Sequence, residues 1–275
     1  MDGTSPEATV TRPLARCYDA AVTLTCWGYF IFAFVFPFCL IYGGAWLLPG
    51  PREPRFQRIN NWYYRGFFRL LSIIAPRHRL LIDEDVRRIR SAVIVCNHLS
   101  YLDPLLMLAL FSRQKTVVKT QFFKVPIFGW VLRNAGYFPA DGAGRYRQMM
   151  IEQVEGMKKY LAAGGIFFIF PEGSRSRDGT IGPLHRGAIK IARLCRAPIH
   201  VLHLEGTDKL FAPGKFFFHA HMANTITLRK VDHIAPDRRQ SLGDLEQRIR
   251  QALATGTAIR QHADPQQTNA HGAIT

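Results

Sequence analysis

A histidine and an aspartate five positions apart follow a β-branched apolar run in this sequence. The run Val93–Val95 ends at Cys96, and His98 and Asp103 come after it. Imidazole is a good general base near neutral pH, and a carboxylate on its other ring nitrogen fixes the tautomer and stabilises the imidazolium. On one continuous helix the two residues would point about 140° apart, so a contact requires the turn to fold back. The alternative is that Asp103 only caps a helix with Pro104 at its first position, and that His98 is a polar turn residue.

A second polar stretch follows the apolar run 166–170. It reads Pro-Glu-Gly-Ser-Arg-Ser and contains Glu172, Gly173, Ser174 and Arg175. Glycine lets backbone amides approach a ligand closely, and the planar fork of an arginine suits a phosphate. A glutamate here can bond a hydroxyl or hold an arginine. The alternative is an ordinary polar loop.

Strands and helices are expected to alternate through the part of the chain that carries both stretches. Short β-branched runs predict strands, and apolar residues at helical spacing predict helices. This alternation is typical of an α/β sandwich with a largely parallel sheet, in which strand-to-helix turns carry reactive side chains. The expected strands are 80–82, 92–96, 116–119, 166–170, 199–204 and 225–231, and the expected helices are 104–111, 126–134, 145–162, 186–195 and 242–253.

An apolar segment near the start of the sequence is long enough to span a bilayer. Residues 20–48 contain no charged side chain, and about 20 apolar residues suffice. Pro37 and the Gly43-Gly44 pair leave open a straight span, a tilted or kinked span, or a helix that bends at Pro37 and returns along the interface. A cleaved signal peptide is the alternative, although the run is long for one and no small-x-small site follows it.

Basic residues predict the orientation of this segment and the division of the chain. Two arginines precede it and five follow within about 20 residues, so the larger domain is expected on the cytoplasmic side of an inner or plasma membrane. Residues 56–75 mix aromatics with arginines at helical spacing, as in an interfacial helix or a core helix with a basic outer face. The expected parts are a tail and membrane segment (1–55), a catalytic domain (56–240) and a C-terminal helix with a frayed tail from residue 255 (241–275).

The composition favours anionic partners. Lys and Arg number 36 against 20 Asp and Glu, a net charge of +16. An anionic leaflet attracts each nearby basic residue by about 1 kcal/mol, which fits a lipid surface and an anionic lysophospholipid. The membrane segment and the lack of a nucleic-acid motif argue against nucleic acid. Five widely spaced cysteines without a CxxC pair indicate a reducing compartment.

Other enzyme classes lack their signatures. There is no G-x-S-x-G elbow for a serine hydrolase, and Gly142-Ala143-Gly144 is followed by Arg147 where a dinucleotide fingerprint needs its third glycine. The pairs His200 with His203 and His219 with His221 have no carboxylate or cysteine cluster beside them. Core or surface histidines are therefore expected there, and no metal site.

Together, the two polar stretches resemble sequence blocks of the glycerolipid acyltransferase family, which includes 1-acylglycerol-3-phosphate acyltransferases. Asn97 and His98 with Asp103 fit its NHxxxxD block, and residues 170–176 fit its FPEGTRS block, with Ser174 in place of threonine. The stretch that begins at Lys119 looks like the family's segment between those blocks, and the Ala-Pro-Ile at 197–199 resembles its late block.

This resemblance covers about residues 75–235 and implies both a fold and a function. The fold would be a mixed, largely parallel sheet flanked by helices, here preceded by the apolar membrane helix or helical hairpin. The function would be a membrane-bound O-acyltransferase of phospholipid biosynthesis. It would move a fatty acyl group from acyl-CoA or acyl carrier protein to the free hydroxyl of 1-acylglycerol 3-phosphate, giving phosphatidic acid, with no cofactor and no metal.

The resemblance also implies the roles of single residues. His98 takes the proton from the acceptor hydroxyl and Asp103 orients it, with no acyl-enzyme intermediate. The residues that would hold the glycerol phosphate are Glu172, Gly173, Ser174 and Arg175, with Arg145 as a helper; Asn97 and Lys119 have supporting positions.

The sequence departs from the family at one block, which usually reads G-x-x-x-(I/V)-D-R. Here Asp141 is followed by Gly142, and the nearest arginines are Arg145 and Arg147. Either Arg145 replaces the missing arginine from a shifted position, or the acceptor is another lysophospholipid or a lyso-aminolipid. A catalytically silent membrane-binding module of the same fold is the non-enzymatic alternative, against which the intact His–Asp pair argues.

Overall fold

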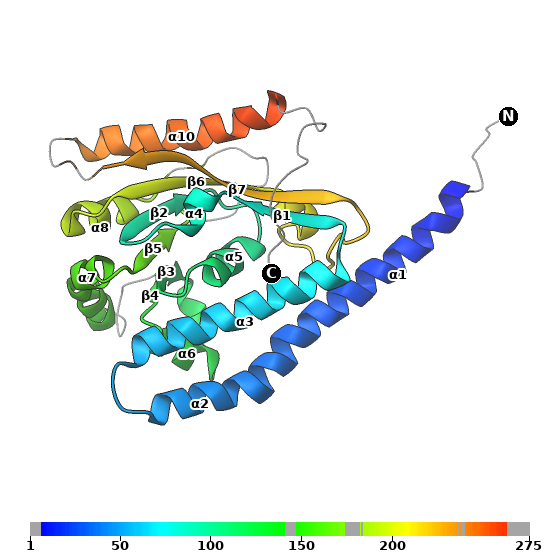
Figure 1. The fold of residues 1–275 in the computed structure, drawn as a ribbon, viewed down its shortest axis with the longest axis horizontal. Coiled ribbons are helices and arrows are strands. Elements are labelled where there is room, and N and C mark those ends of the chain that lie inside the picture. Colours follow the sequence, from blue (N-terminus) through cyan, green and yellow to red (C-terminus); the bar gives the residue numbers. More distant parts are fainter. Residues whose placement is uncertain are drawn as a thin grey trace.

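The computed structural model describes residues 7–140, 147–173, 182, 184–235, 237 and 240–262, and side chains from residue 13 to residue 256 of these. A seven-stranded sheet with the order β1-β7-β6-β2-β5-β3-β4 forms the centre of this part (Figure 1). Only the β6–β7 pair is antiparallel among the described strand pairs, so the expected mixed, largely parallel sheet is confirmed. The strands are β1 (His78–Ile82), β2 (Ala92–Cys96), β3 (Gln114–Val118), β4 (Phe138–Pro139), β5 (Ile166–Ile169), β6 (Ile199–Glu205) and β7 (Asn224–Ile234).

Helices cover both faces of the sheet (Figure 1). Because alternate residues of a strand point to opposite faces, Ile94 and Phe168 pack with α3, α5 and α6, whereas Val93 and Phe167 pack with α7, α8 and α10. The strands are therefore buried on both sides, as parallel strands usually are. The helices are α1 (Glu7–Gly28), η1 (Tyr29–Phe38), α2 (Cys39–Leu47), α3 (Arg52–Ile74), α4 (Glu84–Arg87), α5 (Leu102–Leu110), η2 (Thr120–Lys124), α6 (Phe128–Asn134), α7 (Arg147–Ala162), α8 (Gly187–Cys195), α9 (Thr207–Leu210) and α10 (Leu242–His262).

Two details of the expected helices were wrong. Helix α5 begins at Leu102, so Pro104 is its third residue and not its first; the first four amides of a helix have no partner within it, and proline loses no hydrogen bond there. Helix α10 continues to His262, where a frayed tail was expected from residue 255. Gly256 explains the extension, because a Cβ there would lie 2.5 Å from the ring of His203, so the small residue packs α10 closely onto β6. The rest of the expected tail, 263–275, is outside the described residues.

The apolar segment is one unbroken helix from α1 through η1 to α2. Pro37 lies inside η1, a π-helical stretch, and the amide of Cys39 bonds the carbonyl of Phe34 five residues back. This wider turn accommodates the proline, so the chain does not reverse at Pro37. It reverses between α2 and α3, which lie side by side and form a helical hairpin (Figure 1).

The helix Pro13–Leu47 is the one in the described part of the chain that is long and apolar enough to cross a membrane. One side packs on the domain, where Val22, Cys26 and Tyr42 are buried. The other side leaves large apolar side chains exposed: Leu24, Ile31, Phe32, Val35, Phe36, Leu40 and Leu47. The helix therefore buries one face against the domain and exposes an apolar face on its outer side.

A histidine pair on β6 and β7 predicts a stability loss in acid. The rings of His200 and His233 lie 4.6 Å apart, and Lys230 and Asp85 also face His200. Burial, then His233 and Lys230, lower the pKa of His200 to about 4. Because the unfolded chain binds this proton more tightly, stability present above pH 6.5 is lost as the pH falls toward 4. We expect the melting temperature of the purified protein to fall over that window, and less steeply in His200→Gln; parallel curves would contradict this.

Candidate active site

The turn between β2 and α5 folds back and joins His98 to Asp103. The imidazole Nδ1 lies 2.8 Å from Oδ2 of Asp103, which also accepts the backbone N–H groups of Leu99 and Ser100 at 2.6 and 2.8 Å. Asp103 is fully buried, whereas the His98 side chain is 16% exposed. The carboxylate thus does arrange the backbone before the helix, as the alternative held, and it binds the histidine as well.

The contact defines which ring nitrogen of His98 faces Asp103. An ionised carboxylate only accepts hydrogen bonds, so Nδ1 of His98 carries the proton and donates it to Asp103. The second ring nitrogen, Nε2, is then left with a lone pair. The ring stacks on Phe170, with 4.3 Å between centroids and 24° between planes, which sets its orientation. The arrangement can take a proton from a hydroxyl group.

Thr207 is a part of the site that the sequence did not reveal. Its hydroxyl donates to Oδ1 of Asp103 at 2.6 Å, and both side chains are fully buried. It comes from α9, 104 residues further along the chain, directly after the carboxyl end of β6. A single threonine outside the recognised blocks carries no sequence signal for this role. Each carboxylate oxygen of Asp103 is thus held, Oδ2 by the turn and His98, and Oδ1 by Thr207.

Thr207→Val is therefore expected to lower kcat about tenfold with little change in KM. The substitution keeps the volume but removes a hydrogen bond to a charged group, worth about 1.5–3 kcal/mol. Steady-state kinetics on purified parent, Thr207→Val and Thr207→Ser would measure it, because serine restores the donor. If serine is as impaired as valine, the hydroxyl does not position Asp103.

Asn97 fixes the start of the turn to the neighbouring strand. Its side-chain amide donates to the carbonyl of Leu204 at 2.8 Å, and its side-chain oxygen accepts the Leu204 amide at 2.7 Å. Asn97 thus continues the β2–β6 pairing by one residue with its side chain. Asn97 therefore supports the site by holding the turn against β6.

The Pro-Glu-Gly turn lies beside His98. Oε1 of Glu172 accepts the backbone N–H of His98 at 3.3 Å. Burial raises the pKa of Glu172, although the hydrogen bond from His98 opposes that shift. Gly173 has φ +65°, and a Cβ there would lie 2.8 Å from Nε2 of His185, so only glycine fits this turn. The two polar stretches therefore meet at the carboxyl edge of β2 and β5, which pair in parallel.

Of the other expected site residues, the structure describes only Lys119. Lys119 is exposed at the carboxyl end of β3, two strands from β2 at the same edge of the sheet. Ser174, Arg175 and Arg145 lie outside the described residues. Among the residues the structure describes, no group of three His, Cys, Asp or Glu side chains is arranged to hold a metal ion.

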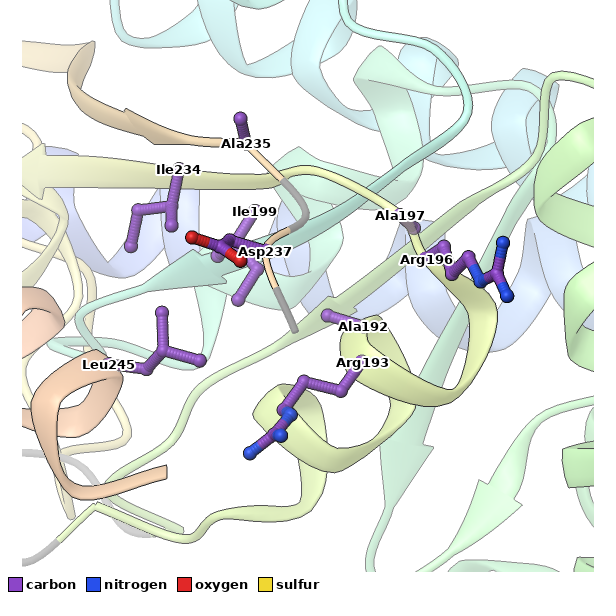
Figure 2. A pocket seen from close by; sticks show the side chains of 9 residues that line it. All are labelled: Ala192, Arg193, Arg196, Ala197, Ile199, Ile234, Ala235, Asp237 and Leu245. Atoms are coloured by element: carbon purple, nitrogen blue, oxygen red, sulfur yellow. The ribbon is translucent and has the colours of Figure 1, made fainter. Parts of the chain in front are cut away.

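A cavity of about 270 Å³ lies elsewhere, between α8, α10 and the sheet (Figure 2). Its lining includes Ile199 at the amino end of β6, together with Arg193 and Leu245. The His–Asp pair lies at the carboxyl edge of the parallel strands, so this cavity is not part of the candidate site.

The fold and the pair define an α/β domain with a histidine bound to a buried carboxylate at the carboxyl edge of its sheet. Comparisons with known proteins show which class of enzyme this domain is similar to. Residues 78–204 match the family model described as Acyltransferase. A 1-acyl-sn-glycerophosphate acyltransferase, PlsC, of Thermotoga maritima has the same fold, with a TM-score of 0.67 and 20% identity, covering 92% of this chain and all of that one.

Curated relatives share the same region. A chloroplastic 1-acyl-sn-glycerol-3-phosphate acyltransferase of Brassica napus is 35% identical over 125 residues, which are 44% of this chain and 35% of that protein. A probable 1-acyl-sn-glycerol-3-phosphate acyltransferase of Mycoplasma pneumoniae is 26% identical over 57% of this chain and 58% of its own length. The match thus spans about a third of the plant relative and somewhat more than half of the bacterial one. Residues 78–204 of this chain thus form an acyltransferase domain that is similar to the one in the 1-acyl-sn-glycerol-3-phosphate acyltransferases.

Proposed function

We propose that this chain transfers a fatty acyl group from an acyl thioester to the free hydroxyl of 1-acylglycerol 3-phosphate, which gives phosphatidic acid. The observation that carries the proposal is the bond from Nδ1 of His98 to the buried Asp103, which leaves Nε2 free to accept a proton. The names of the curated relatives support the acceptor. The donor is acyl-CoA or acyl carrier protein, and neither needs a further cofactor.

In the proposed reaction, the acyl group passes directly from the thioester sulfur to the hydroxyl oxygen of the acceptor. His98 Nε2 takes the hydroxyl proton as the acceptor oxygen attacks the thioester carbonyl. The new C–O bond forms, the C–S bond breaks, and the thiol leaves with the proton returned by the imidazolium. Asp103 stabilises the imidazolium between these steps. Cys96, the nearest thiol along the chain, is buried, and burial raises its pKa well above the ordinary value, so it stays a thiol and does not compete as nucleophile.

The acceptor's phosphate is assigned to the second polar stretch. Glu172 and Gly173 lie against the turn that carries His98, so a glycerol phosphate bound there would present its hydroxyl to Nε2. Ser174 and Arg175 follow them in the chain, and Arg145 is the candidate for the missing second-block arginine. The surplus of positive charge, +16, favours both the acceptor and an anionic leaflet.

We also propose that the outer face of the helical hairpin contacts the membrane. The exposed apolar side chains of Pro13–Leu47 would otherwise be in water. Helix α3 adds Trp62, which is 55% exposed, and exposed arginines at 58, 65 and 69 on the same helical stripe. Aromatic and basic side chains together are typical of the headgroup region. Because more arginines follow the apolar segment than precede it, the catalytic domain would face the cytoplasm.

The acceptor is tested by a panel. Purified, detergent-solubilised protein would receive a labelled acyl thioester, as CoA or carrier-protein conjugate, with glycerol 3-phosphate, lysophosphatidic acid, another lysophospholipid or a lyso-aminolipid. Preferred transfer to lysophosphatidic acid is the expected result. Transfer only to another acceptor would overturn the acceptor and make the altered second block a specificity determinant. No transfer to any acceptor would favour the catalytically silent module.

Arg175→Ala is expected to raise KM for the acceptor at least tenfold and to leave KM for the thioester nearly unchanged. An arginine bound to a phosphate in a bidentate manner contributes a charge-assisted hydrogen bond of about 1.5–3 kcal/mol. Kinetics with each substrate varied in turn would measure the two constants, with Arg175→Lys as the charge-matched control. Equal losses for both substrates would contradict a role in holding the phosphate.

A further inference from the structure

The segment between α9 and β7, residues 211–223, joins the catalytic turn to the apolar helix. At its start, the carbonyl of Phe211 accepts the hydroxyl of Ser100 at 2.6 Å, and the backbone N–H of the same serine binds Asp103. Phe211 also stacks on Phe218, with 4.4 Å between centroids and 16° between planes. The base of the segment is thus part of the scaffold of the active site.

The same segment docks on α1. Asp19 accepts the backbone N–H of His221 at 2.9 Å and lies 2.7 Å from its Nδ1, and Thr23 accepts the N–H of Phe218 at 2.9 Å. Asp19 and Thr23 are buried. These bonds explain the polar side chains inside the first part of the helix, and they fix the segment against it.

The tip of the segment exposes several large apolar side chains. Phe216 and Phe217 are 55% and 51% exposed, and Met222 is 60% exposed. Phe216 stacks on Trp27 of α1, with centroids 5.6 Å apart and planes 9° apart, so the tip continues the apolar outer face of the helix. Lys215 is exposed beside the tip. Apolar side chains edged by lysine suit the surface of an anionic bilayer.

We propose that residues 211–223 form a second lipid-contacting element, which inserts Phe216 and Phe217 into the bilayer beside the apolar helix. This inference rests on the proposed membrane-bound function. The occupant is a lipid surface because the patch is continuous with the candidate membrane helix through Trp27 and has a cationic side chain at its edge. Through Phe211 and Ser100, the element also fixes the height of the catalytic turn above the lipid.

A fluorescent probe tests the position of the tip without any need for acyl transfer. Cys17 and Cys39 are the cysteines that are not buried, so a Cys17→Ser/Cys39→Ser chain would carry Phe217→Cys labelled with a polarity-sensitive fluorophore. The control label is at Leu194→Cys, which is 61% exposed on α8 at the other face of the sheet. Both full-length proteins are reconstituted into phosphatidylcholine–phosphatidylglycerol vesicles.

The two probes are expected to differ. The probe at 217 should shift to the blue and be quenched by lipids brominated in their acyl chains, whereas the probe at 194 should be quenched by aqueous iodide. Equal iodide quenching at both positions would overturn the proposal. Shielding of 217 from both quenchers would also overturn it, since that result indicates a second copy of the chain on this patch.

Kinetics separate this inference from the proposed function. In Phe216→Ser/Phe217→Ser, KM for a vesicle-borne acceptor should rise at least tenfold, which corresponds to about 1.4 kcal/mol, because the two phenyl rings no longer bury apolar surface in the bilayer. The rate with a short-chain, water-soluble acceptor should stay at the parent value. An equal loss with both acceptors would assign the phenylalanines a structural role and refute the lipid contact. Absence of transfer in the parent would refute the proposed function and leave the fluorescence result standing.

Discussion

Replacing His98 by alanine is expected to lower kcat by about 10²–10⁴-fold, the range that a positioned general base contributes. Without the imidazole, the acceptor hydroxyl would have to lose its proton to water during attack on the thioester. The fold should persist, because the ring is at the edge of the site and contacts Phe170 by stacking and Asp103 through one bond. Acyl transfer under saturating substrates would measure the loss, and thermal unfolding would verify the fold.

A matched histidine strengthens this test. His233 is exposed and pairs with His200 at the amino end of β6, whereas the site lies at the carboxyl end. His233→Ala therefore removes an imidazole without touching the site and should keep the parent kcat. Retained turnover in a folded His98→Ala protein would refute the assignment of His98 as the base.

Replacing Asp103 by asparagine is expected to cost a similar 10²–10⁴-fold in kcat while the protein stays folded. The amide oxygen can accept from His98, Leu99 and Ser100 in place of Oδ2, and the amide N–H₂ can donate to the hydroxyl of Thr207, which also accepts. The hydrogen bonds are thus preserved in a new pattern. What is lost is the negative charge that stabilises the imidazolium.

Asp103→Ala separates charge from structure. Alanine leaves the buried donors of Leu99, Ser100 and Thr207 without an acceptor, and each unsatisfied group costs about 1–3 kcal/mol. We expect both variants to lose activity and only the alanine variant to lose several degrees of melting temperature. An asparagine variant with parent kcat would show that the charge of Asp103 takes no part in the reaction.

The strands of the sheet were predictable because their signals are local. Buried parallel strands read as continuous β-branched runs, so β2 and β6 were expected within one residue of their observed ends. The sequence left the His98–Asp103 contact open beside a capping role for Asp103, and the structure shows the contact. The two-residue strand β4 was missed because so short a run carries no periodicity.

The parts that were not predictable depend on contacts between distant segments. Thr207 reaches Asp103 across 104 residues, and His221 reaches Asp19 across 202. No sequence pattern around a threonine or an aspartate predicts which distant residue it will contact. The continuation of α10 past residue 255 likewise depends on Gly256 packing on His203, a tertiary contact that outweighs the low helix propensity of glycine.

The measurement that tests the central claim most directly is a single turnover with an acyl thioester labelled in its acyl group. Purified protein in excess would be mixed with the thioester and lysophosphatidic acid, quenched in acid at intervals, and analysed for label in lipid and in protein. The account predicts that label passes into phosphatidic acid with none on the protein at any time. Label that appears first on the protein, or no labelled phosphatidic acid at all, would contradict direct transfer by His98.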